Sequence, residues 1–269
     1  MNHKKIELNS SSTSFLVPYL LDKTAPFVLI IPGGGYNHYG SKEQESVALK
    51  FNEAGFSCGI LYYSLSPFKF PAPLLDLARA MLYIRKMEKV WKIKNSKIIV
   101  CGFSAGGHLA SLLGSYWNSS LLKYFLPGEY PENPLLLKPE CLCLCYPVIT
   151  AEKDFCHEGS ISALTENLTD SDKKIILSLC AAGNVRDVVS TEKLVSKDFP
   201  PVFLWHTLED SAVPAENTLF LAQALRKSGV NFEYHLFSTG SHGLSLAEGT
   251  PAGNWTNLFF EWYKTLFTS

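Results

Sequence analysis

Short apolar runs alternate with amphipathic stretches along most of this chain. Six runs of mostly apolar residues are typical of strands, and the first of them ends at a proline followed by three glycines. The runs are residues 27–31, 56–62, 97–101, 141–146, 202–206 and 231–237. Apolar residues recur at helical spacing in residues 41–54, 74–90, 215–228 and 255–267. This alternation predicts an α/β fold in which helices cover both faces of a mostly parallel sheet.

Three further stretches complete the predicted fold. Residues 4–20 predict one or two antiparallel edge strands, which gives about eight strands in all. Residues 117–139 and 150–198 break the rhythm, and the first of them is rich in proline. We expect both to be irregular insertions that form a small lid over the carboxyl ends of the strands, where open α/β sheets bind ligands. We expect residues 1–269 to form a single domain.

The strand at 97–101 continues into the most informative stretch of the chain, Gly102-Phe103-Ser104-Ala105-Gly106, which precedes a predicted helix. The pattern G-x-S-x-G is typical of a nucleophile elbow, a strained turn that lifts a serine hydroxyl above the sheet. Small flanking residues allow the tight backbone approach that such a turn needs. A structural serine in a glycine-rich turn is the alternative. Because suitable partners follow later in the chain, we predict that Ser104 is a nucleophile.

A serine nucleophile needs a base and an acid that orients the base. In the order Ser…Asp…His, the acid follows a late strand and the histidine follows the last strand. Asp210 comes after the strand at 202–206, and His242 comes after the strand at 231–237. We favour Asp210 over the adjacent Glu209, because an aspartate at this point of the loop has room to reach the histidine.

The other histidines that we weighed have weaker contexts. His108 lies on a helix one turn beyond the predicted nucleophile, where we expect a structural hydrogen bond. His206 ends a strand and is a candidate for supporting the site. His235 lies inside a strand, and His3 and His157 lack a suitable context.

The predicted chemistry also needs two backbone donors for the oxyanion of a tetrahedral intermediate, and removing one costs about 3–4 kcal/mol. The amide of Ala105 supplies one donor at the start of the helix. The loop Pro32-Gly33-Gly34-Gly35-Tyr36 fits the other, because its glycines let amides turn inward. A flexible loop or a phosphate cradle is the alternative, and the phosphate cradle fails because no Gly-Lys-Ser/Thr follows.

Composition narrows the class of protein. Hydrophobic residues make up 46% of the 269 residues and the net charge is −1, so we expect a globular protein that binds neither nucleic acid nor a membrane. The N-terminus lacks the apolar stretch of a signal peptide, which predicts a cytoplasmic protein with seven reduced cysteines. Cys141, Cys143 and Cys145 alternate with leucines as strand residues do. We therefore expect no metal and no cofactor.

These residues resemble those of the α/β-hydrolase superfamily over essentially the whole chain. More narrowly, the chain is similar to small bacterial esterases of the acetyl-xylan-esterase-like or sugar-ester hydrolase subgroup, near the hormone-sensitive-lipase type. The matching segments are Pro32-Gly33-Gly34-Gly35-Tyr36, residues 102–110, Tyr146-Pro147-Val148-Ile149, Trp205-His206-Thr207 with Asp210 and Val213-Pro214, and Gly240 with His242-Gly243-Leu244. The elbow and histidine segments are shared by the whole superfamily. The Pro-Gly-Gly-Gly-Tyr segment at 32–36 and the Trp-His-Thr segment at 205–207 are more specific to the subgroup.

The resemblance implies Ser104 as nucleophile, His242 as base and Asp210 as the orienting acid. It implies Gly34 and Ala105 as oxyanion donors, with Gly35 assisting. Pro32 stands where the lipase-like pattern has a histidine that fixes the loop, which leaves the second donor open. The sugar-esterase-like subgroup itself tends to carry this proline.

We therefore predict a serine carboxylesterase that removes short acyl groups, acetyl above all, from sugars or oligosaccharides through an acyl-enzyme. The alternatives are an oligopeptidase-like serine hydrolase and a non-catalytic binding protein on the same fold. Tyr36, Tyr146 and Val213 are candidates for lining the substrate pocket. The expected binding partner is a small ester, namely an acylated sugar. A homodimer is also compatible with the sequence.

Overall fold

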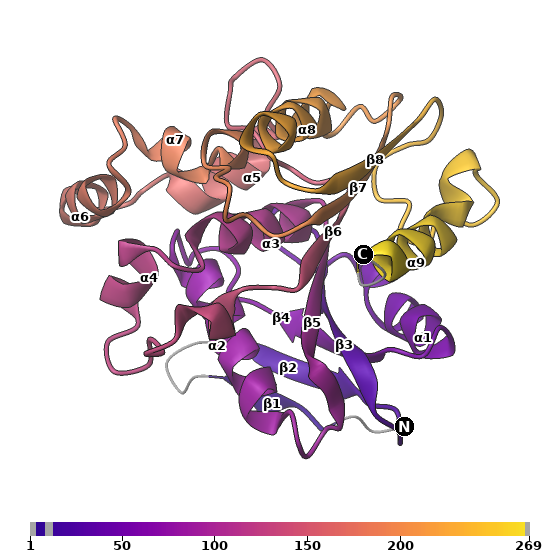
Figure 1. The fold of residues 1–269 in the computed structure, drawn as a ribbon. Coiled ribbons are helices and arrows are strands. Elements are labelled where there is room, and N and C mark those ends of the chain that lie inside the picture. The colour runs from indigo at the N-terminus through magenta and orange to yellow at the C-terminus, as the bar shows by residue number, and fades with distance from the viewer. Residues whose placement is uncertain (1–3, 9–12, 267–269) are drawn as a thin grey trace.

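The computed structural model describes residues 4–8 and 13–266, and its strands form one eight-stranded sheet (Figure 1). The strand order is β1-β2-β4-β3-β5-β6-β7-β8. The strands are β1 (Ile6–Glu7), β2 (Phe15–Tyr19), β3 (Ala25–Ile31), β4 (Ser57–Tyr62), β5 (Ile93–Phe103), β6 (Cys141–Cys145), β7 (Val202–Thr207) and β8 (Phe232–Phe237). At one edge β1 pairs with β2, and β2 with β4, in antiparallel fashion, whereas the other five pairs are parallel. The predicted mostly parallel sheet of about eight strands is confirmed.

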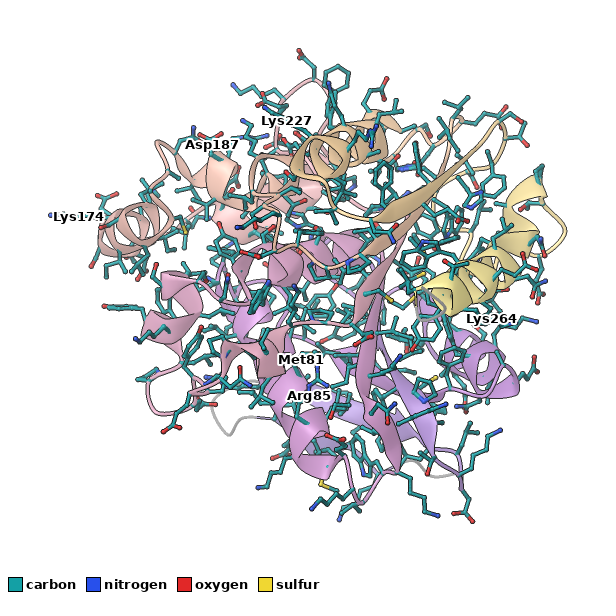
Figure 2. The ribbon with its side chains drawn as sticks, in the orientation of Figure 1. Met81, Arg85, Lys174, Asp187, Lys227 and Lys264 are labelled. Atoms are coloured by element: carbon teal, nitrogen blue, oxygen red, sulfur yellow. The ribbon has the colours of Figure 1, made fainter. Side chains whose placement is uncertain are left out.

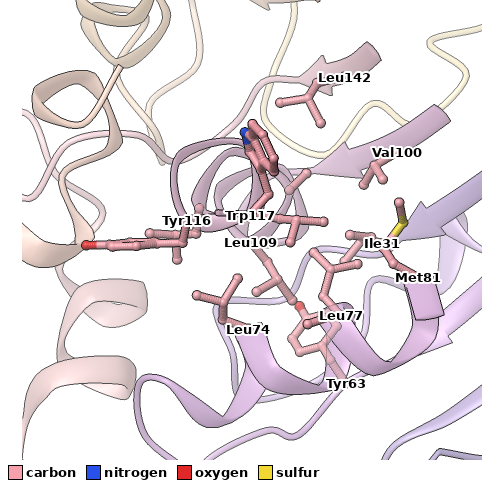
Figure 3. Packing of buried hydrophobic residues seen from close by; sticks show 14 of the residues in the cluster. Ile31, Tyr63, Leu74, Leu77, Met81, Val100, Leu109, Tyr116, Trp117 and Leu142 are labelled. Carbon is pink, nitrogen blue, oxygen red and sulfur yellow. The ribbon is translucent and has the colours of Figure 1, made fainter. Parts of the chain in front are cut away.

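Helices cover both faces of this sheet (Figure 1). Along β3, Val28 and Ile30 point to one face and Leu29 and Ile31 to the other, because side chains of a strand alternate. The first face is covered by α1 (Glu45–Glu53) and α9 (Trp255–Thr265), and the second by α2 (Ala72–Met87), α3 (Ala105–Tyr116) and α8 (Glu216–Ser228). Figure 3 shows the second face, where α2 and α3 contribute Leu74, Leu77, Met81, Leu109 and Tyr116.

The two stretches expected to be irregular contain short helices. They are α4 (Ser120–Phe125), α5 (Glu158–Thr165), α6 (Asp170–Cys180) and α7 (Val185–Val189), with 3₁₀ turns at Pro134–Leu137 and Thr191–Lys193. The prediction of irregular backbone is therefore wrong for these residues. Each of these four α-helices has an N-cap residue whose side chain accepts a hydrogen bond from a backbone amide of the first turn. The N-cap residues are Ser119, His157, Thr169 and Asn184. Such caps stabilise helices that are too short to show a clear apolar period.

The first of these stretches lies along α2. The chain leaves α3 at Trp117, after running from the carboxyl edge of the sheet towards its amino edge. The side chain of Arg85, labelled in Figure 2, donates to the carbonyls of Leu136 and Lys138 at 3.3 and 3.1 Å. Residues 117–139 are therefore held beside α2 and do not line the cleft at the carboxyl edge, which differs from the predicted lid.

A few predictions fall on residues whose structure is not described. They are the end of the last predicted helix at residue 267, residues 9–12 of the predicted edge segment, and His3. Among the residues described, none of the helices has the length and apolar character needed to cross a bilayer.

Candidate active site

Ser104 is the single residue between β5 and α3. Its backbone angles, φ 51° and ψ −119°, lie in a region that residues other than glycine rarely adopt. Gly106 makes this turn sterically possible, since a Cβ there would lie 2.1 Å from the carbonyl oxygen of Ile31. Strand, strained serine and helix therefore form the elbow that the sequence pattern predicts, with the hydroxyl at the carboxyl edge of the sheet.

The structure brings Ser104, His242 and Asp210 together at this edge. The hydroxyl of Ser104 lies 2.8 Å from Nε2 of His242, and Nδ1 of His242 lies 2.6 Å from Oδ2 of Asp210. A carboxylate only accepts hydrogen bonds, so Nδ1 carries the proton and Nε2 is free to accept the serine hydroxyl. This is the arrangement in which a histidine can remove the proton of a serine nucleophile.

The carboxylate of Asp210 is buried and surrounded by donors. Oδ1 accepts the amides of Ala212 and Val213 at 3.0 and 2.9 Å, and Oδ2 accepts Nε2 of His206 at 3.1 Å besides His242. Burial alone raises the pKa of Asp210, but the hydrogen bonds from His206 and His242 outweigh it and hold the pKa below its usual range. The carboxylate is therefore ionised, as an acid that orients a histidine must be.

His206 holds Asp210 from a second side. Its ring is fully buried, and Nε2 also lies 3.0 Å from the carbonyl oxygen of Val213. Both of these partners are acceptors, so Nε2 donates to them. Glu209 instead accepts the amide of Gly240 at 3.1 Å, so its carboxylate is turned to a different partner. His206 therefore supports the site through Asp210, as expected from the sequence.

The glycine loop after β3 packs directly on the elbow. A Cβ on Gly33 would lie 2.8 Å from Cβ of Ser104, so only glycine fits there. Gly34 has a φ of 115°, and the amides of Asn37 and His38 both donate to its carbonyl. Within the described residues, the amides of Gly34 and Gly35 donate to no acceptor, although both glycines line the cleft with Ser104. Either amide is therefore available to an oxyanion.

The amide of Ala105 is the other candidate donor for an oxyanion at this site. Ala105 is the first residue of α3, so no helical carbonyl lies in reach of its amide. It also belongs to the positive end of the helix dipole, which favours a negative charge beside Ser104.

Glu43 is a functional candidate that sequence reasoning missed. Its buried carboxylate accepts the amide of Gly33 at 2.7 Å through Oε2 and the hydroxyl of Tyr146 at 2.7 Å through Oε1. It thereby fixes the loop that Pro32 opens. The sequence signal was that proline, which stands where the lipase-like pattern has a histidine.

The three predicted substrate contacts do not line the cleft, which corrects the sequence-based prediction. Tyr36 is 1% exposed and its hydroxyl lies 2.9 Å from Nδ1 of His108. Tyr146 is 1% exposed and bonded to Glu43, while Val213 is fully buried. The two tyrosine hydroxyls bond buried groups and Val213 packs in the core, so all three side chains lie beneath the surface of the site.

The cleft beside Ser104 has a volume of about 500 Å³. Several residues with polar groups line it beside Tyr39, namely Asn37, His38, Ser41, Lys42 and His157. His157 was set aside in the sequence for lack of context, because its place in the cleft wall beside Ser104 and His242 arises only in the tertiary structure.

The cysteines form a compact group inside the sheet. The sulfur atoms of Cys101, Cys143 and Cys145 lie within 4.8 Å of one another and are fully buried. Parallel pairing places Cys101 beside Cys143, and the strand period places Cys145 on the same face. Strand packing therefore accounts for the group, and the absence of a bound metal stays a prediction.

A mostly parallel sheet with a serine elbow after β5, and with an aspartate and a histidine after β7 and β8, defines an α/β hydrolase. The chain belongs to the BD-FAE family, whose model matches residues 15–225. The prolyl oligopeptidase family model matches residues 182–269, the part that carries Asp210 and His242.

The sequence is also similar to individual proteins that act on xylan or its esters by name. The chain is 32% identical to endo-1,4-beta-xylanase B of Butyrivibrio fibrisolvens over 89% of this chain and 35% of that protein. It is 24% identical to an acetylxylan esterase of Xylanibacter ruminicola over 89% of this chain and 46% of that protein. The chain thus spans about a third to a half of these curated relatives.

Among solved structures, the fold matches an acetyl ester-xyloside bifunctional hydrolase from Caldicellulosiruptor lactoaceticus. The TM-score is 0.84 and the identity 38%, over 98% of this chain and 96% of that one.

Proposed function

We propose that this protein is a serine carboxylesterase that hydrolyses short-chain esters, chiefly acetyl esters, of sugars or oligosaccharides. The observation that carries the proposal is the continuous line of hydrogen bonds from Ser104 through His242 to Asp210, at 2.8 and 2.6 Å. The substrate class is supported by relatives whose names include acetylxylan esterase and acetyl ester-xyloside hydrolase. Asn37, Lys42 and His157 in the cleft wall carry polar groups that suit the oxygens of a hydroxylated substrate.

In the proposed reaction, Oγ of Ser104 attacks the ester carbonyl while Nε2 of His242 takes its proton. The negative oxygen of the tetrahedral intermediate accepts the amide of Ala105 and that of Gly34 or Gly35. The intermediate then expels the alcohol, which receives the proton from His242. Water attacks the resulting acyl-enzyme with His242 again as base, which releases the acid and restores Ser104.

The oligopeptidase-like alternative rests on one observation, the match of residues 182–269 to the prolyl oligopeptidase family. Peptide bonds and esters are cleaved by the same set of serine, histidine and aspartate, so the two functions differ in substrate and not in the reacting groups.

One substrate panel separates these functions. Purified protein and its Ser104→Ala variant are assayed on p-nitrophenyl acetate, acetylated xylo-oligosaccharides and a peptide anilide. We expect the wild type to release acetate from the first two, and the variant to release none above background. Hydrolysis of the anilide alone would support the oligopeptidase, and activity on none of the three would leave a binding protein.

We also propose that the protein works in the cytoplasm. All seven cysteines are free thiols, and five of them are buried. A reducing compartment keeps such thiols free. Fractionation of the source cells with an antibody to this chain tests this, and recovery outside the cytoplasm would contradict it.

A further inference from the structure

His157, just before α5, lies in the wall of the cleft. It caps α5, where its Nδ1 accepts the amide of Ser160 at 3.1 Å. A Cβ on Gly35 would lie 3.7 Å from Cε1 of His157, so the ring stands next to the oxyanion loop. The same ring lines the cleft together with Ser104 and His242.

The cap decides which ring nitrogen of His157 carries the proton. Because Nδ1 accepts an amide, a neutral ring must hold its proton on Nε2. Burial, and after it the neighbouring His242, lowers the pKa of His157, which keeps the ring neutral at neutral pH. His157 therefore presents a single N–H donor, at Nε2.

This donor has no acceptor among the described residues: the hydrogen bonds of the His157 ring all involve Nδ1 and Ser160. In the free protein water accepts from this N–H group, and a ligand that displaces the water must supply an acceptor or leave the donor unpaired. The ring lies in the wall of the reaction cleft, so a bound substrate is in a position to supply that acceptor.

The chemistry of the substrate shows which part of it can accept. The carbonyl oxygen of the ester is taken by the amides of the oxyanion loop and Ala105, and the methyl of an acetyl group accepts no hydrogen bond. The remaining acceptors of an acetylated sugar are the hydroxyl and ring oxygens of its alcohol part. Asn37 and Lys42 also line the cleft with polar groups suited to such oxygens.

We propose that His157 is a specificity-determining residue that donates a hydrogen bond from Nε2 to a hydroxyl or ring oxygen of the sugar. This inference rests on the proposed esterase function and names the residue that distinguishes a sugar ester from a plain one. A site built to bond a polar group rejects an analogue that lacks it, because the donor is then left unpaired.

The test compares two acetate esters. One is a mono-acetylated methyl xyloside, which keeps free sugar hydroxyls, and the other is phenyl acetate, whose alcohol part has no free hydroxyl. The variant His157→Asn keeps an N-cap acceptor for Ser160 but removes the donor that reaches the cleft. We expect the ratio of kcat/KM for the sugar acetate to kcat/KM for phenyl acetate to fall about tenfold or more. His157→Ala, which removes the cap as well, should lower that ratio equally.

The matched control is His235→Asn, the same exchange on β8, where His235 pairs with Glu233 at 2.7 Å. Its ratio should equal that of the wild type. If the ratio of the two kcat/KM values is unchanged in His157→Asn, the proposal is wrong. This includes the case in which both esters lose activity equally, because His157 would then act on the reacting groups or the fold. A wild-type protein that cleaves neither acetate would contradict the esterase function itself, and this inference with it.

Discussion

Oε2 of Glu43 lies 2.7 Å from the amide nitrogen of Gly33, so a buried acid holds the first glycine of the loop beside the nucleophile. Its other oxygen accepts the hydroxyl of Tyr146, and that hydroxyl in turn accepts the amide of Ser245 at 2.8 Å. Ser245 lies three residues after His242. One carboxylate thus ties the oxyanion loop to the segment that carries the proposed base.

Replacing Glu43 by alanine should therefore disturb catalysis without touching a reacting group. We expect Glu43→Ala to lower kcat about 10- to 100-fold with a smaller change in KM, because a displaced oxyanion donor weakens the transition state more than binding. Glu43→Gln keeps an acceptor for Gly33 and should recover part of the loss. Steady-state kinetics on p-nitrophenyl acetate measure both, and a wild-type kcat in Glu43→Ala would contradict this role.

Ser104→Ala should abolish ester hydrolysis while the fold is retained. The expected loss in kcat is on the order of 10³-fold or more, since the acyl-enzyme can no longer form. The measurement is ester turnover together with thermal unfolding, and Ser46→Ala on the exposed side of α1 is the control for a lost hydroxyl. Genuine wild-type turnover in the variant would remove Ser104 from the mechanism.

The pH dependence of stability should reveal the buried Asp210. Its pKa is lowered in the folded state, so the folded state favours the ionised carboxylate. This contribution to the free energy of unfolding is complete above the unfolded-state pKa of about 3.9 and is lost as the pH falls towards the folded-state pKa. Urea unfolding of wild type and Asp210→Asn should thus differ most above about pH 5 and converge at lower pH. A difference that stays constant down to about pH 2 would argue against an ionised Asp210.

Acyl chains beyond about four carbons should be poor substrates. Each buried CH₂ would add about 0.8 kcal/mol of binding in a deep apolar pocket. A long acyl chain in this cleft would desolvate polar groups such as those of Asn37 and Lys42, and that cost should offset the gain. Comparing kcat/KM for p-nitrophenyl acetate, butyrate and octanoate decides this. A preference for octanoate over acetate would exclude a short-chain esterase.

Chelators should leave ester hydrolysis unchanged, since the proposed reaction uses only side chains and backbone amides. Prolonged dialysis against EDTA, followed by the p-nitrophenyl acetate assay, tests this. The cysteine group at Cys101 is the place to examine if activity is lost, and restoration of that activity by zinc would show that the prediction is wrong.

The parallel sheet and the elbow could be predicted because their signals are local. Apolar strands, helical periods and the turn around Ser104 are each contained in a few neighbouring residues. The short helices α4 to α7 were missed because polar caps, and not a long apolar period, define them.

The environment of the site could not be predicted in the same way. Tyr36 and Tyr146 were expected at the surface of the cleft, yet their hydroxyls bond inward to His108 and Glu43. Glu43 and His157 act through partners that only the tertiary structure brings near. Such roles depend on the folded loops and leave no pattern in the chain.

Ser104 and His242 touch although 138 positions separate them in the chain. Closing so long a loop carries a large entropic cost, and contacts of this range slow folding. Turnover accordingly requires β5, β7 and β8 to be aligned in one sheet, whatever local helices have already formed. The return of hydrolysis during refolding therefore reports when these three strands have come into register, which makes the enzyme a reporter of its own assembly.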